Sequence, residues 1–181
     1  MFALISAILG RFGVNRSAQA GVEFALIAPM MLMLLFVSFE LTDTLGAVKR
    51  AENTAASLAD VVSRDVIVTD AEIDDVFEAV RWLVWPGDAT AVKVRISSLF
   101  VDDDGQVEVV WSEGRGMSAL SVGAPVSLPG GLRLPQSGIV MVETVTSYRP
   151  PLGLFSAVPF EISKTEYRRP RVVDPVARAA S

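Results

Sequence analysis

The chain contains no cysteine and no histidine among its 181 residues. Disulfides, thiolate or imidazole metal sites, cysteine nucleophiles and Ser-His-Asp triads are therefore all excluded. No long basic run is present and the net charge is −5, which argues against nucleic acid as a partner. No candidate nucleophile has a base near it in sequence. We therefore expect a protein that is not an enzyme and that needs no cofactor.

Hydrophobic residues make up 51% of the chain and are concentrated near its N-terminus. Every residue from 24 to 39 is apolar except Ser38. With the neighbouring Gly21, Val22 and Leu41, the segment reaches about 20 residues, the length at which a helix crosses a hydrocarbon core of about 30 Å. The sequence therefore predicts one membrane-spanning helix, and the lipid bilayer is the first expected partner.

The charges on either side of this segment predict its orientation. Arg11 and Arg16 precede it, whereas Glu40 and Asp43 are the first charges after it. Because cytoplasmic flanks are enriched in cations, we expect a cytoplasmic N-terminus and a C-terminal domain outside the cytoplasm. A secretory signal peptide cleaved near residues 45–47 is the alternative, although the apolar run is long for that role.

Helical character continues beyond the apolar segment. Residues 47–64 contain no proline, and between 48 and 62 apolar side chains recur every three or four positions, which forms one stripe. We therefore expect a single helix from about Ser17 to about Arg64, with its first half in lipid. Pro29 lies inside it and favours a kink, although membrane helices also tolerate proline without one.

The remaining sequence predicts a short helix and about four strands. Thr69 and Glu72 have the spacing of a capping box, so a helix should begin near Asp70. Alternating apolar residues predict strands, and Gly, Pro and Ser residues predict a loop over 114–137. The tryptophans Trp82, Trp85 and Trp111 are expected in the core. The expected strands cover 91–101, 107–113, 138–148 and 158–169.

These elements predict an α+β fold, a long N-terminal transmembrane helix with a small antiparallel sheet packed on its outer half. The expected organisation is a leader (1–18), the transmembrane half of the helix (19–46), an external α+β domain (47–171) and a loose tail (172–181). Asp102, Asp103 and Asp104 are interpreted as a turn rather than a calcium site, because no wrapping loop with a following glutamate is present. Arg168, Arg169 and Arg171 are interpreted as a solvated strand end.

The leader with its arginines, "VEFALIAP" (22–29) and the Leu- and Met-rich run after it resemble the TadE-like family. These proteins are minor pseudopilins of the bacterial Tad (Flp, tight adherence) pilus system, a branch of the type IV pilin-like proteins. "VTSYRPPLGLF" (145–155) and "YRRPR" (167–171) are similar to the C-terminal part of that family. The resemblance implies a periplasmic domain and assembly with other pilins and pseudopilins on the Tad inner-membrane platform.

The resemblance also implies trimming of the leader by a prepilin peptidase. The family pattern is a glycine, four residues, a glutamate and an aromatic residue. Glu23 and Phe24 match the acidic-aromatic pair, but Ala18 stands at the glycine position. Cleavage would then fall between Ala18 and Gln19.

Glu23 carries the assembly hypothesis. A carboxylate in lipid costs several kcal/mol unless it is paired. A free amine on a neighbouring subunit could pair with it and set the stagger between helices, which is the best-attested use of such pairs. The other interpretation is a solvated residue at the headgroup level. A bitopic protein whose external domain binds a ligand or envelope partner is the alternative function.

Overall fold

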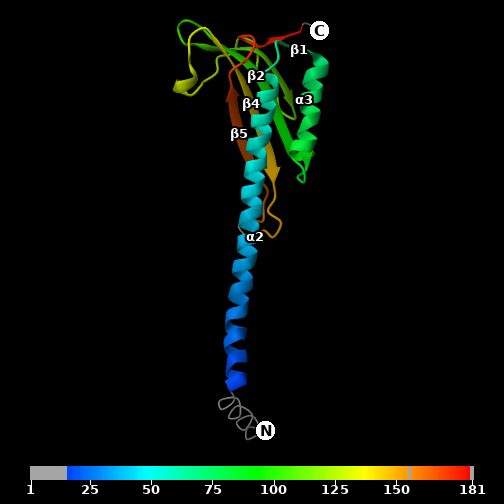
Figure 1. Ribbon diagram of the computed structural model, residues 1–181, viewed down its shortest axis with the longest axis vertical. Coiled ribbons are helices and arrows are strands. Elements are labelled where there is room, and N and C mark those ends of the chain that lie inside the picture. The colour runs from blue at the N-terminus through cyan, green and yellow to red at the C-terminus, as the bar shows by residue number, and fades with distance from the viewer. Residues whose placement is uncertain (1–15, 155, 180–181) are drawn as a thin grey trace.

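The computed structural model describes residues 16–154 and 156–179, with side chains from Gln19 onward. One long helix projects from a small head, and the head contains the described residues that follow the helix (Figure 1). The α+β class, the second helix and the four-stranded antiparallel sheet are confirmed. The elements are α2 (Arg16–Val62), β1 (Ile67–Val68), α3 (Asp70–Leu83), β2 (Val92–Val101), β3 (Val107–Arg115), β4 (Ser137–Tyr148), β5 (Phe160–Arg168) and β6 (Ala177–Arg178).

Helix α2 confirms the single long helix expected from the sequence. Its 47 residues extend about 70 Å at 1.5 Å per residue, and the helix is continuous through Pro29. Its second half packs on β4 and β5 through a face of mostly small side chains, which lets the sheet approach the helix closely. The buried members of this face are Ala47, Ala51, Thr54, Ala55, Leu58, Ala59 and Val62.

Helix α3 begins where its capping box predicts. The Thr69 hydroxyl accepts the Glu72 backbone N–H at 3.3 Å, and the Glu72 carboxylate accepts the Thr69 backbone N–H at 2.8 Å. The backbone N–H and the hydroxyl of Thr69 both donate to the Glu72 carboxylate at 2.8 Å, and these two bonds hold the pKa of the Glu72 carboxyl below its usual range. The apolar face of α3 packs beside α2 on the sheet and consists of Ile73, Val76, Phe77 and Val80.

We expect Glu72→Gln to lower the unfolding midpoint of the head at pH 7. Because the pKa of Glu72 is lower in the folded state, its stabilising effect is present above its unfolded pKa of about 4.3 and is lost as the pH falls through its folded pKa. The difference from wild type should therefore shrink toward pH 3. Urea unfolding across this pH range tests the prediction, with the exposed Glu78→Gln on the same helix as the control. A pH-independent difference would contradict it.

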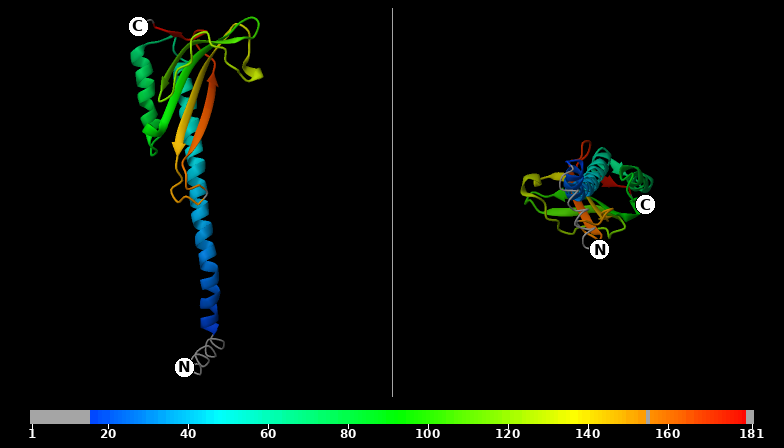
Figure 2. Two further views of the ribbon diagram at one scale, coloured as in Figure 1. Left: turned by 180° about the vertical axis from the view of Figure 1, so that it is seen from behind. Right: turned by 90° about the horizontal axis from the view of Figure 1, so that it is seen from below.

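The sheet has the order β3-β2-β4-β5, with all neighbours antiparallel. Helices α2 and α3 cover one face of it, and Figure 2 shows both from behind and from below. Val94 and Ile96 of β2 and Val142 of β4 point into this helix-covered core. A bulge in β3 lies opposite Ser98 and Leu99 of β2. Because of this bulge, Trp111 faces the helices while Val109 faces the other side of the sheet.

The opposite face of the sheet has a second small core. The predicted loop 114–137 is confirmed in outline, since irregular chain begins after β3 ends at Arg115. This loop returns along β3, where the Val109 backbone N–H donates to the Ala124 carbonyl at 3.2 Å. Leu128 of the loop is buried against the sheet residues Leu99, Val101, Val107, Val109, Ile139 and Met141.

The tail is not loose as far as residue 179. Strand β6 pairs with β1 in parallel, and Val176 is fully buried in the main core. The Val176 carbonyl accepts the Trp111 indole N–H at 2.9 Å and the Ser98 hydroxyl at 3.0 Å. A Cβ on Gly138 would lie 2.7 Å from Pro175 Cα, so the tail crosses β4 where only glycine fits. The predicted boundary of the head at residue 171 is therefore wrong.

Two further expectations need correction. Trp111 is buried as predicted, but Trp82 and Trp85 are 82% and 74% exposed. Trp82 lies off the apolar face of α3, and Trp85 lies just beyond the end of that helix. Arg171 is not a simply solvated residue, because its guanidinium pairs with Asp60 of α2. Its backbone N–H also donates to the Ser63 carbonyl at 2.8 Å.

Candidate functional site

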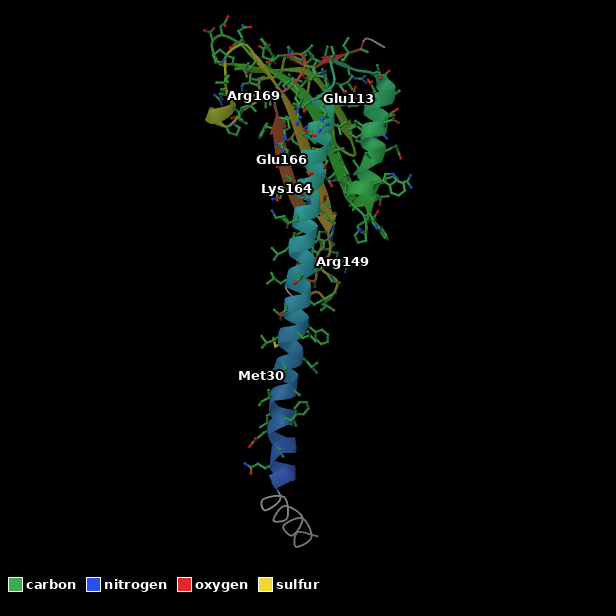
Figure 3. The ribbon with its side chains drawn as sticks, in the orientation of Figure 1. Met30, Glu113, Arg149, Lys164, Glu166 and Arg169 are labelled. Carbon is green, nitrogen blue, oxygen red and sulfur yellow. The ribbon has the colours of Figure 1, made fainter. Side chains whose placement is uncertain are left out.

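The first half of α2 buries none of its apolar side chains within the described chain. Its apolar side chains are exposed, for example Phe24 at 68%. Figure 3 shows Met30 projecting from this part of the helix, well away from the head. A helix this long and apolar near the N-terminus is consistent with single-pass membrane anchoring, because lipid would cover apolar side chains whose contact with water is unfavourable.

The residues predicted for processing and assembly lie along this exposed segment. Ala18 is in the first turns of α2, and residues 1–15 of the predicted leader lie outside the described residues. Gln19 donates from its amide nitrogen to the Glu23 carboxylate at 3.2 Å, one turn away. Glu23, Phe24 and Pro29 are all exposed on the helix surface. The structure therefore leaves Glu23 accessible to a neighbouring group.

A different carboxylate marks the junction between the helix and the head. Glu40 directly follows the apolar segment and is completely buried. Its two carboxylate oxygens accept the Leu154 backbone N–H at 3.0 and 2.8 Å. A buried carboxylate without hydrogen bonds would be strongly disfavoured, so this bond both satisfies Glu40 and holds the β4–β5 connection on α2.

A second contact lies one turn further along α2. The Tyr148 hydroxyl donates to Asp43 Oδ2 at 2.6 Å and lies 3.3 Å from the Thr44 hydroxyl. Burial and the hydrogen bond to Asp43 raise the pKa of Tyr148 above its usual value. The ring also packs edge-on against Phe160, with centroids 5.5 Å apart. Tyr148 ends β4 and Phe160 begins β5, so the base of the hairpin is fixed to the helix.

The local sequence explains how the connection reaches Glu40. Pro150 and Pro151 follow Tyr148 and cannot donate to a sheet ladder, which ends the strand there. Gly153 has φ of 69°, a conformation that most side chains disfavour. This turn places the next backbone N–H, that of Leu154, against Glu40. We call the set Glu40, Asp43, Thr44, Tyr148 and Leu154 the junction cluster.

The junction cluster holds two segments of the chain together through hydrogen bonds. Within the described ranges, no group of three or more acidic side chains could hold a metal ion. The expected turn at Asp102 is present, and the Asp102 carboxylate accepts the Gln106 backbone N–H at 2.7 Å. The chemistry of the junction is therefore that of a structural connection between an exposed apolar helix and a folded head.

Sequence reasoning missed the role of Glu40. The sequence indicates Glu40 only as a flanking charge, because it is the first acidic residue after the apolar run and its partner lies far away in the chain. Comparisons with known protein families, curated proteins and solved structures find no match for the chain.

Proposed function

We propose that this protein is a minor pseudopilin or assembly protein of a Tad-type pilus, and that it is not an enzyme. The observation that carries the proposal is the division of α2. One half is apolar and exposed, while the other half packs against the sheet of a small α+β head. A helix of this kind anchors the protein in the inner membrane and can then pack against the helices of other pilins.

Glu23 has the central role in this proposal. It is the only charged residue in the exposed stretch from Gln19 to Phe39, and its carboxylate is bonded only to the neutral Gln19 amide among described groups. Within a bundle of apolar helices, the carboxylate would need a cation. The free amine of a processed neighbouring subunit would supply one and would fix the axial stagger between the two helices.

The expected processing can be measured directly. Co-expression with a Tad-type prepilin peptidase should give a mature chain that begins at Gln19, and N-terminal sequencing or mass spectrometry would detect it. A catalytically inactive peptidase is the control and should leave the leader in place. An intact leader in the presence of the active enzyme would remove the processing step from the proposal.

The assembly role predicts a selective defect. Glu23→Ala should insert into membranes normally but reduce pilus formation and co-purification with other pilins by at least about tenfold, the effect of losing one charge-assisted contact of about 1.4 kcal/mol or more. Ser38→Ala is the matched control, because the Ser38 hydroxyl only donates to the Leu34 carbonyl of its own helix at 2.8 Å. Normal piliation in the Glu23→Ala strain would contradict the assembly role.

One observation favours the alternative, a bitopic protein whose external domain binds a partner. A shallow apolar groove runs between α2 and α3, lined by Leu58, Val61, Val76, Ala79 and the exposed Trp82. A partner with an apolar segment could bind there without any polymerisation. Normal piliation of the Glu23→Ala strain, combined with loss of partner binding in the Trp82→Ala variant, would favour this alternative.

A further inference from the structure

Exposed apolar side chains gather at the end of the head that faces the apolar half of α2. Leu152, Leu154 and Val158 in the β4–β5 connection are 45%, 51% and 69% exposed. Trp82 and Trp85, at the end of α3, are more exposed still. We call these five residues the membrane-facing rim. Water contact with so much apolar surface is unfavourable, so the rim needs a covering surface.

The register of the sheet places both parts of the rim at one end. Val92 begins β2 just after the α3–β2 turn and pairs with Thr146 of β4. The β4–β5 hairpin closes two residues later, at the Tyr148–Phe160 pair. Figures 1 and 2 show the end of α3 and the β4–β5 connection both facing the apolar half of α2.

Glu40 sets the level of the β4–β5 part of this rim along α2, and the end of α3 lies somewhat further from the apolar run (Figure 1). Glu40 is the residue that follows the apolar run of 24–39, and its carboxylate holds the Leu154 backbone N–H. The β4–β5 connection therefore lies where the apolar run ends. In a chain anchored by that run, this is the boundary between hydrocarbon and headgroups.

We propose that the membrane-facing rim inserts into the interfacial layer of the bilayer that anchors α2. Tryptophan is enriched at this layer, where its ring is partly apolar and its N–H can reach water or headgroups. Arg149 is exposed at the same end of the head (Figure 3), and its guanidinium can bind lipid phosphates. The head therefore rests on the membrane through two loops, in addition to its helical anchor. This inference rests on membrane anchoring and is independent of pilus assembly.

Lipid fits this surface better than a protein partner does. The rim lies at the end of the head nearest the apolar half of α2, so a protein bound there would have to occupy the headgroup layer beside the helix (Figures 1 and 2). The rim also continues directly from the exposed apolar surface of α2, at the level fixed by Glu40. One bilayer can cover both surfaces at once.

The absence of cysteine makes a depth measurement straightforward. Leu152→Cys and Val158→Cys, each labelled with an environment-sensitive fluorophore, would be reconstituted as full chains in phosphatidylcholine–phosphatidylglycerol vesicles that contain spin-labelled lipids. Val122→Cys is the control, because Val122 is 73% exposed in the loop at the other end of the sheet, next to the Gly123–Val109 hydrogen bond.

We expect quenching at both rim sites to be at least about threefold that at Val122, because the quencher is confined to a bilayer about 40–45 Å thick. Arg149→Glu should reduce rim quenching when phosphatidylglycerol is present and change it little in pure phosphatidylcholine. Equal quenching at all three sites, in vesicles without any other protein, would overturn the inference. Since the two rim cysteines are independent exposed positions, failure of one variant to fold leaves the other as a test.

Discussion

Glu40→Ala should release the β4–β5 connection from α2 and speed hydrogen exchange at the Leu154 amide by about 10- to 100-fold. The expected size follows from the loss of a hydrogen bond to a charged group, worth about 1.5–3 kcal/mol. Glu40 is fully buried and its two oxygens accept the same N–H, so alanine removes the acceptor and leaves the amide free to open. Hydrogen-exchange mass spectrometry in micelles or nanodiscs measures this change.

The matched control is Glu52→Ala, on the same helix but within the head. The Glu52 carboxylate pairs with Lys49 on the surface at 2.9 Å and makes no contact with the β4–β5 connection in the described chain. Exchange at Leu154 should be unchanged in this variant. Glu40→Gln should give an intermediate rate, because its amide oxygen can still accept one N–H without a charge. Wild-type protection in Glu40→Ala would show that other contacts hold the connection in place.

Val176→Ala should destabilise the head by about 2 kcal/mol. The substitution removes two methyl groups from a fully buried side chain, at about 0.8 kcal/mol each, and leaves a small cavity. Val172→Ala, in the same tail but 62% exposed, should change stability by no more than about 0.5 kcal/mol. Urea unfolding monitored by tryptophan fluorescence and by circular dichroism compares the two variants.

Removal of residues 172–181 should have a larger effect than either substitution. It leaves the Trp111 indole N–H and the Ser98 hydroxyl without the Val176 carbonyl, and it leaves β1 without its partner strand. Each buried donor without an acceptor costs about 1–3 kcal/mol in addition to the lost apolar burial. A truncated chain with wild-type urea sensitivity would refute the assignment of the tail to the core.

The regular elements could be predicted because their signals are local. The stripe in residues 47–64 repeats with the helical period, and the Thr69–Glu72 capping box lies within one turn. The exposure of Trp82 was also predictable in principle. It stands two positions from Val80, about 200° away around a helix with 3.6 residues per turn, and so lies off the apolar face.

The tail and the junction could not be predicted because their partners are distant in sequence. Glu40 and Leu154 are 114 residues apart, and neither residue has a neighbouring pattern that indicates the other. Strand β6 has only two residues, and it pairs with an equally short β1. Two-residue strands carry no detectable alternation of apolar and polar residues. The position of the tail is therefore specified only by the folded core, in which Val176 is buried.

The continuity of α2 has a mechanical consequence. The helix passes from the exposed apolar segment into the head without a flexible linker between Arg16 and Val62, and its second half lies lengthwise against β4 and β5. Tension along its axis is therefore borne in shear by the whole helix–sheet contact, a geometry that resists rupture better than peeling from one end. Torque is transmitted in the same way, so rotation of the apolar half turns the head with it.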